Sequence, residues 1–355
     1  MENVKLTQYS HGAGCGCKIS PAVLDVILKN NESSKDFKNL LVGNSNRDDA
    51  AVMDLGDGTA LITTTDFFMP IVDDAKDFGK IASANAISDV YAMGGTPMIA
   101  IAILGWPVEK INPELAAKVL EGSREICALA NIPLAGGHSI DSPEPIFGLA
   151  VTGRVDIKNL KQNSTAKEGD YLFITKPIGI GIMGTAMKRG ILRTEDYSVF
   201  INTMTQLNKV GEELGKIKGV NALTDVTGFG LLGHLIEMAE GSGLSAEIEY
   251  SKIPMIEGID FYTKQFCFPD NTTRNLNSYK EKIAGMDGLE FITLCDPQTS
   301  GGLLVSVAPN SIDEYSALIK KSGLENIALE SIGRMIAQDE KVVKLMTKSI
   351  NSAHI

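Results

Sequence analysis

The chain has 355 residues, 44% of them hydrophobic, and a net charge of −11 at pH 7. This composition favours about two globular domains with buried cores, and an acidic chain without any basic run argues against a nucleic-acid partner. The five cysteines form no disulfide framework, the first residues are not a signal peptide, and no apolar run reaches the length of a membrane span. We therefore expect a cytoplasmic protein with no membrane association.

The N-terminal segment is rich in glycine and places Cys15 and Cys17 one residue apart, directly before Lys18. Glycine lets a loop fold closely around a small ligand, and a neighbouring ammonium group favours the reactive thiolate. The segment therefore predicts a reactive cysteine. Two alternatives stay open. His11 and both cysteines are candidate zinc ligands, although the fourth ligand of a structural site is missing, and a glycine-rich terminus can simply be mobile.

The first half of the chain alternates strands and helices. We expect a helix over 20–28, strands around 51–53 and over 59–65, 98–104 and 146–155, a buried helix from Asp77 to 94–95, and a helix from Asn112 to about Leu129. The apolar run 98–104 predicts a strand buried on both faces. The small residues 134–139 predict a loop whose amides approach phosphate oxygens, or merely a tight turn.

Acidic residues dominate the stretch from 48 to 75, which holds seven aspartates and no lysine or arginine. Turns explain most of them, but Asp49 and Asp66 lie at predicted strand ends. Asp89 is the lone charge between 81 and 108 in a helix that should be buried, so it requires a cation or a distant arginine partner. Because magnesium binds carboxylates together with substrate phosphates, these three residues and Asp225 predict magnesium ions that hold a triphosphate.

The second half repeats the mixture after a polar linker over 159–169. We expect strands over 171–175, 246–250 and 303–307, helices over 183–190, 196–216, 230–239 and 311–322, a polar turn over 295–302, and two closing strands. Gly179–Gly184 matches a dinucleotide-binding fingerprint, but a second helix follows where that fold needs a strand, so we reject this function. The pattern predicts two related α+β domains.

Seven segments together resemble the selenophosphate synthetase family, also called selenide, water dikinase. They are residues 6–18, 47–50, 64–68, 85–89, 135–139, 223–230 and 296–302. The resemblance implies an α+β (α/β) fold of the aminoimidazole ribonucleotide synthetase type, which dimerises through a central β-barrel. It also implies the formation of selenophosphate, AMP and orthophosphate from ATP, selenide and water.

The resemblance further implies roles for particular residues. Cys15 would be the reactive residue, with Lys18 as its essential neighbour, and Asp49, Asp89 and Asp225 would bind more than one magnesium ion. The residues expected to contact ATP are Lys18, Arg47, Asp48, Asp66, Asp89, Gly137, His138 and Ser139. The implied organisation is a catalytic segment over 1–20, an ATP- and metal-binding domain over 21–158 and an α/β domain over 170–355. A homodimer, a monovalent cation and a selenium-delivery protein are further partners that the resemblance allows.

Two other functions remain open. A kinase or synthetase of the same fold could act on another nucleophile, although the cysteine-lysine segment argues against it. A cysteine-based selenium or metal carrier would not turn over ATP, and the aspartates argue against that class. Magnesium-dependent ATP binding would distinguish a carrier from an enzyme.

Overall fold

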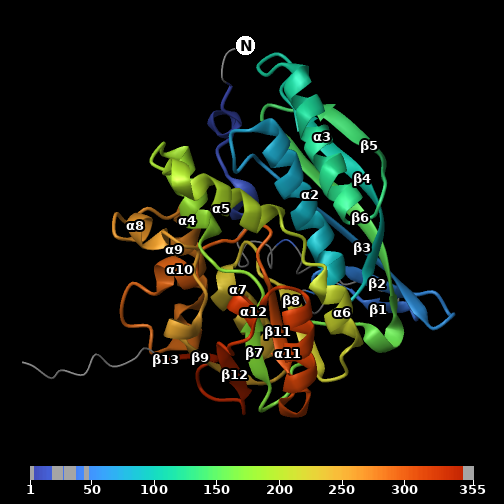
Figure 1. The fold of residues 1–355 in the computed structure, drawn as a ribbon, viewed down its shortest axis with the longest axis vertical. Helices are drawn as coiled ribbons and strands as arrows, with labels where there is room; N and C mark the ends of the chain where they lie inside the picture. The colour runs from blue at the N-terminus through green and yellow to red at the C-terminus, as the bar shows by residue number, and fades with distance from the viewer. Residues whose placement is uncertain (1–3, 18–26, 28–36, 44–47, 347–355) are drawn as a thin grey trace, which may run out of the picture.

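The first half of the chain forms a six-stranded sheet (Figure 1). The computed structural model describes residues 4–17, 27, 37–43 and 48–346, so the helix expected over 20–28 lies almost wholly outside the described residues. The strands are β1 (Leu40–Val42), β2 (Ala51–Asp54), β3 (Thr59–Phe68), β4 (Thr96–Trp106), β5 (Leu134–Asp141) and β6 (Ile146–Asp156). Their order is β1-β2-β3-β6-β4-β5, with β4 and β5 parallel and the other neighbours antiparallel.

Two expectations about these strands are wrong. Asp66 is not at a strand end, because β3 continues to Phe68. Residues 134–139 are not a loop, because their backbone pairs with β4 as strand β5. Gly137 suits this pairing: it has φ +158°, and a Cβ there would lie 2.3 Å from the carbonyl oxygen of Ala102. A glycine in a strand commonly marks such a close backbone approach.

A buried helix, α2 (Ala75–Ala92), lies against one face of this sheet. Its N-cap is Asp74 rather than the expected Asp77, since Asp74 Oδ1 accepts a hydrogen bond from the backbone N–H of Asp77 at 2.9 Å. Helix α3 (Pro113–Leu129) packs on α2 and begins after Asn112, as expected. Layers of helix and sheet therefore bury α2 nearly all round.

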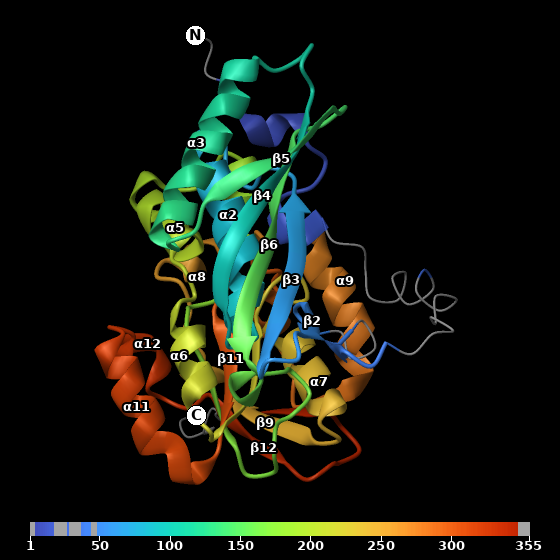
Figure 2. The same ribbon diagram turned by 90° about the vertical axis from the view of Figure 1, so that its right-hand side faces the viewer.

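The other face of the same sheet is open and apolar in the single chain. Figure 2 looks onto this face, which no helix of the described part of the chain covers. Phe67, Ile101 and Ile140 are 49%, 47% and 59% exposed, respectively. The expectation that β4 is buried on both faces is therefore wrong for the isolated chain. A strand can also be apolar throughout because one of its faces packs on the core and the other is open to a second surface.

The second half forms a seven-stranded sheet with helices on both faces. Its order is β10-β13-β9-β12-β7-β11-β8. The strands are β7 (Tyr171–Ile174), β8 (Val220–Asp225), β9 (Ser245–Glu249), β10 (Ile283–Ala284), β11 (Leu303–Val307), β12 (Gly333–Ile336) and β13 (Val343–Met346). The helices are α4 (Ile180–Lys188), α5 (Thr194–Thr205), α6 (Val210–Lys216), α7 (Gly230–Gly241), α8 (Ile259–Thr263), α9 (Asp270–Tyr279), α10 (Phe291–Leu294), α11 (Ile312–Lys321) and α12 (Glu325–Ala328). Among the described residues, no helix combines the length and apolar character needed to cross a membrane.

The helix expected over 196–216 is instead two helices, α5 and α6. The chain becomes extended at Gln206, whose φ and ψ are −66° and 123°. The backbone oxygen of Gln206 accepts a hydrogen bond from Lys176 Nζ at 2.6 Å, and Asn208 Nδ2 donates to Ser88 Oγ and to the Gly301 carbonyl at 2.8 Å each. These tertiary contacts hold the backbone in a break between the two helices.

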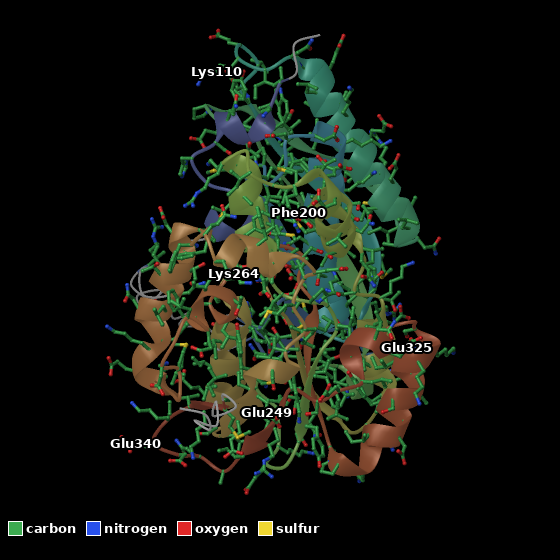
Figure 3. All side chains as sticks on the ribbon, turned by 60° about the vertical axis from the view of Figure 1, so that its left-hand side comes forward. Lys110, Phe200, Glu249, Lys264, Glu325 and Glu340 are labelled. Atoms are coloured by element: carbon green, nitrogen blue, oxygen red, sulfur yellow. The ribbon has the colours of Figure 1, made fainter. Side chains whose placement is uncertain are left out.

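One hydrophobic core cluster contains residues of both halves. It includes Phe78 and Ile87 of α2 together with Ile182 of α4 and the fully buried Phe200 of α5, which is labelled in Figure 3. Helix α2 therefore belongs to the first half by sequence but packs against the second half as well. Polar residues on α2 consequently lie at the junction of the two halves.

Candidate active site

The segment around Cys15 is docked at this junction. Gly14–Cys17 forms one 3-10 turn, and Cys15 is fully buried. The backbone N–H of Gly14 donates to the Met69 carbonyl oxygen, and that of Cys15 donates to Thr299 Oγ1, each at 3.0 Å. Gly14 has φ +51°, and a Cβ there would lie 2.4 Å from Thr299 Oγ1. The glycine thus permits a close contact between the N-terminal segment and the second half.

Asn85 of α2 connects Cys15 with Asp66. The Cys15 thiol donates to Asn85 Oδ1, with 3.2 Å between Sγ and Oδ1, and the backbone N–H of Ser300 donates to the same oxygen at 2.7 Å. Asn85 Nδ2 in turn donates to Asp66 Oδ2 at 2.6 Å. The structure therefore links the cysteine expected to react with a carboxylate expected to contact ATP.

Asp49, Asp89 and Asp225 come together beside this link. Asp225 ends β8, Asp89 accepts a hydrogen bond from Thr64 of β3, and Asp49 Oδ1 accepts one from Thr224 Oγ1 at 2.9 Å. Burial raises the pKa of Asp49 well above its usual value, and the charges of Asp225 and Asp89 raise it further. Like charges held this close favour binding of a cation.

The three carboxylates are suited to a magnesium ion that also binds a substrate phosphate. Asp49 Oδ2 is shielded from solvent and has no hydrogen-bond partner in the described part of the chain. Among residues 4–17, 27, 37–43 and 48–346, however, no three His, Cys, Asp or Glu side chains converge into a complete metal-binding group. Magnesium usually takes one or two carboxylates and completes its shell with water and substrate phosphates.

Asp48 lies next to the aspartate cluster. Its Oδ1 accepts a hydrogen bond from the backbone N–H of Asn163 at 2.9 Å, and burial raises its pKa to about 6. Lys18 and Arg47 lie outside the described residues, so their expected roles stay predictions.

Gly137, His138 and Ser139 are not brought to the aspartates within one chain. They lie on β5, the exposed edge strand, and β6 and β4 separate β5 from β3. Their predicted contact with ATP therefore requires another surface to bring them near the site.

Sequence reasoning assigned no role to Asn85, Thr299 or Ser300. The available signal was the polar character of Asn85 in an otherwise apolar helix, four residues before Asp89 and on the same face. The segment around Thr299 and Ser300 carried part of the family resemblance, but nothing in the sequence shows that it touches the N-terminal segment. Ser300 has φ +51°, which is unusual for a residue other than glycine.

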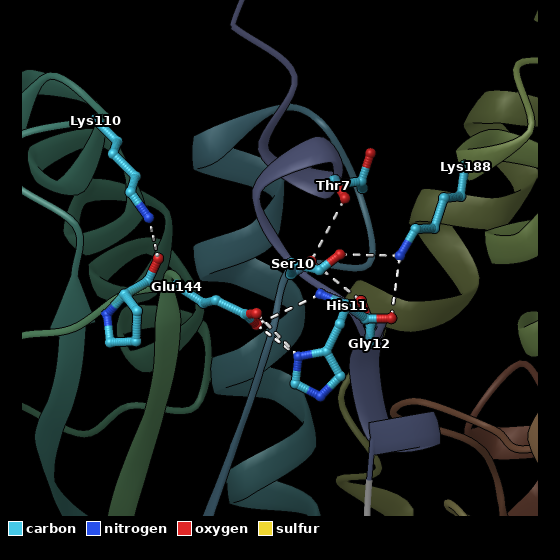
Figure 4. Close-up of polar contacts among 8 residues, drawn as sticks. Thr7, Ser10, His11, Gly12, Lys110, Glu144 and Lys188 are labelled. Carbon is cyan, nitrogen blue, oxygen red and sulfur yellow. Dashed lines mark hydrogen bonds and ion pairs between the residues drawn. The ribbon is translucent and has the colours of Figure 1, made fainter.

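The N-terminal segment is also fixed on its outer side (Figure 4). His11 Nδ1 lies 2.9 Å from Glu144, and Lys188 Nζ donates to the carbonyl oxygens of Ser10 and His11 at 3.0 and 3.3 Å. His11, one of the candidate zinc ligands, thus pairs with an acidic side chain.

A cleft of about 460 Å³ lies on this outer side. The N-terminal segment forms one wall with Gly12, Ala13 and Gly16, and α4 and the start of α9 form the other. The charged residues that line it, besides His11, are Lys188, Arg189, Arg274 and Asp270. Cations outnumber anions here, in contrast to the aspartate cluster.

Family models match both halves. The model described as AIR synthase related protein, N-terminal domain, matches residues 47–155, and the one described as the C-terminal domain matches residues 167–346. Solved structures agree on the fold: thiamine monophosphate kinase from Aquifex aeolicus has a TM-score of 0.66 at 17% identity and covers 91% of this chain and 96% of its own. The hydrogenase maturation protein HypE in complex with ATP has a TM-score of 0.62 at 15% identity, covering 94% and 88%, respectively. The fold and the two matches define an AIR synthase related protein.

Curated relatives are much more similar. Selenide, water dikinase from Aeromonas hydrophila subsp. hydrophila is 55% identical over 95% of this chain and 97% of its own. The proteins of that name from Photorhabdus laumondii subsp. laumondii and Colwellia psychrerythraea are 56% and 54% identical over 94% and 98% of this chain and 96% and 100% of their own. The chain belongs to the selenide, water dikinase family.

Proposed function

We propose that this protein is a selenophosphate synthetase, an enzyme that converts ATP, selenide and water to selenophosphate, AMP and orthophosphate. The carrying observation is the hydrogen-bonded path from the buried Cys15 thiol through Asn85 to Asp66, beside the aspartate cluster. Phosphoryl transfer needs a nucleophile positioned beside a neutralised polyphosphate, and this arrangement would place Cys15 beside carboxylates suited to a magnesium-bound polyphosphate. The full-length similarity to selenide, water dikinases supports the same reaction.

Magnesium would be held by Asp49, Asp89 and Asp225. The charges of Asp225 and Asp89 raise the proton affinity of the buried Asp49 in the protein alone, which supports a cation as their partner. Bound magnesium would neutralise charge that develops on the transferred phosphoryl group. Asp48 and Asp66, and Lys18 and Arg47 as predicted from the resemblance, would orient the nucleotide.

Cys15 and the glycine-rich segment would serve the selenide side of the reaction. Selenide is a soft anion, so a sulfur atom and the predicted ammonium of Lys18 are suitable contacts. Because Cys15 is buried, the segment in this position keeps water away from the thiol before the reaction. The cationic cleft formed by Lys188, Arg189 and Arg274 supports approach of an anion from the opposite side of the segment.

We further propose a homodimer formed through the open face of the six-stranded sheet. The large apolar side chains exposed there are Met53, Phe67, Ile99, Ile101 and Ile140. A contiguous apolar face of this kind is typical of a protein interface. Pairing two such faces would complete a barrel and bring Gly137, His138 and Ser139 of β5 toward the ATP site of the partner.

Phosphorus NMR of the reaction mixture tests the proposed chemistry. The protein is incubated without oxygen with ATP, magnesium and selenide, and we expect a selenium-coupled phosphorus signal together with AMP and orthophosphate. Cys15→Ser should lose the selenium-coupled signal, while Cys127→Ser, a change at a buried cysteine of α3, should keep it. Formation of ADP alone, with or without selenide, would contradict this function.

A further inference from the structure

The side-chain amide of Asn85 has its orientation set by two partners that cannot exchange roles. The backbone N–H of Ser300 can only donate, so it must face Asn85 Oδ1, at 2.7 Å. Asp66 as a carboxylate can only accept, so its Oδ2 must face Asn85 Nδ2, at 2.6 Å. The atom 3.2 Å from Cys15 Sγ is therefore a hydrogen-bond acceptor.

An acceptor at this position favours the protonated thiol. The S–H group can donate to Asn85 Oδ1, whereas a thiolate would meet an oxygen of partial negative charge. The amide cannot turn to offer its NH₂ group without breaking the hydrogen bonds to both Ser300 and Asp66. The hydrogen bonds of Asn85 thus fix its amide oxygen as the atom that it presents to Cys15 Sγ.

We propose that Asn85 is a positioning residue that holds Cys15 as an unreactive thiol in the resting protein and ties it to Asp66. This inference deepens the proposed function and rests on it for the importance of Cys15. A buried, protonated thiol resists alkylation and oxidation, since thiolate is the reactive form. Reaction at Cys15 would then require the N-terminal turn to leave Asn85, so that reactivity is coupled to the position of this turn.

Ser300, whose backbone N–H donates to Asn85 Oδ1, is itself held in place by hydrogen bonds. Ser300 accepts hydrogen bonds from the buried Lys176, whose Nζ lies 2.8 Å from the Ser300 carbonyl oxygen. Thr299 Oγ1 holds the backbone N–H of Cys15. Neighbouring residues of one segment therefore fix both the backbone of Cys15 and the acceptor that its thiol meets.

Alkylation of Cys15 by iodoacetamide tests the inference. The full-length protein is treated without oxygen and without ligands from pH 6 to 9, and tandem mass spectrometry of the tryptic peptide 6–18 separates Cys15 from Cys17. In Asn85→Ala we expect the rate of Cys15 alkylation at pH 7 to rise at least tenfold, with the pH profile of this rate displaced to lower pH. In Asn85→Asp, which keeps an acceptor beside the thiol, the rate at pH 8 should be at least threefold below that of the unaltered protein.

Asn208→Ala is the matched control. Asn208 is an equally buried amide that also joins α2 to the 296–302 segment, through Ser88 and Gly301, but has no hydrogen bond to Cys15 or Asp66. We expect the rate of Cys15 alkylation in this variant to stay within twofold of the rate in the unaltered protein.

Two results would overturn the proposal: an unchanged rate in Asn85→Ala, or an equal rise in Asn85→Ala and Asn208→Ala, which would mean that the segment has merely opened. If Asn85→Ala fails to fold, Asn85→Asp decides, and a rate equal to or above that of the unaltered protein rejects the role. Alkylation needs neither ATP nor selenide, so this inference can fail while the NMR experiment supports the reaction, and the converse also holds.

Discussion

At the scale of single residues, the aspartate cluster favours binding of a cation but lowers the stability of the metal-free protein. Asp49 faces Asp225, Asp89 and Asp48, and its pKa is raised well above the usual value. The folded protein then binds more protons than the unfolded chain, so the stability contributed by such a group is present at low pH and is lost as pH rises through the folded pKa. For Asp48 that loss runs from the ordinary value of 3.8 up to the folded pKa of about 6. A cation that neutralises the cluster would restore this stability.

We therefore expect Asp49→Asn to raise the melting temperature of the metal-free protein at pH 8, because one repelling charge is removed. One pKa unit corresponds to about 1.4 kcal/mol, and each kcal/mol shifts the melting temperature by about 2–4 °C in a domain of this size. Thermal unfolding in a chelator, followed at pH 5 and pH 8, should show a gain at pH 8 that shrinks at pH 5. Asp54→Asn, at the half-buried last residue of β2, whose Oδ1 accepts a hydrogen bond from the backbone N–H of Gly56, should show no such gain. A lower melting temperature for Asp49→Asn at pH 8 would contradict the charge argument.

At the scale of secondary structure, the position of α2 depends on two glycines. A Cβ at Gly79 would lie 1.9 Å from the Val119 carbonyl oxygen, and one at Gly122 would lie 2.0 Å from that of Lys76. We expect Gly79→Ala and Gly122→Ala each to lower the free energy of unfolding by about 1–3 kcal/mol, the usual cost of overpacking, despite the better helix propensity of alanine. Urea unfolding measures the loss, and Lys118→Ala on the exposed side of α3 is the control. Unchanged stability would mean that the helices separate at little cost.

Helices and strands were predictable from sequence where local pattern decides them. The apolar character of α2 from Ile81 onward correctly predicted its burial, and Asp89, the lone charge between 81 and 108, lies in the candidate site. Tertiary contacts decided the rest: pairing with β4 makes residues 134–139 a strand, and contacts of Gln206 and Asn208 divide the helix expected over 196–216. The joining of Cys15 to Asn85 and Thr299 could not be predicted, because these contacts span 70 and 284 positions of the chain.

At the scale of the whole molecule, the N-terminal segment lies between two regions of opposite charge. Asn85 and Asp66 lie on its inner side, beside the aspartates, whereas Lys188, Arg189 and Arg274 line the cleft on its outer side. A magnesium-bound triphosphate suits the first region and an anionic acceptor suits the second. The chain as a whole is strongly acidic, so this local excess of cations would favour an anion at the outer side over the rest of the surface.

The open sheet face gives the last prediction, which concerns assembly and activity together. Ile101 is 47% exposed at the middle of this face, so Ile101→Glu should leave the single chain folded but place a charge inside the proposed barrel. We expect light scattering to give half the mass of the unaltered protein. Because Gly137, His138 and Ser139 would reach ATP only from the partner, the KM for ATP should rise at least fivefold. Ile191→Glu, at a 39% exposed isoleucine between α4 and α5, should change neither quantity. A half-mass protein with an unchanged KM for ATP would place β5 outside the nucleotide site, and an unchanged mass would reject the interface itself.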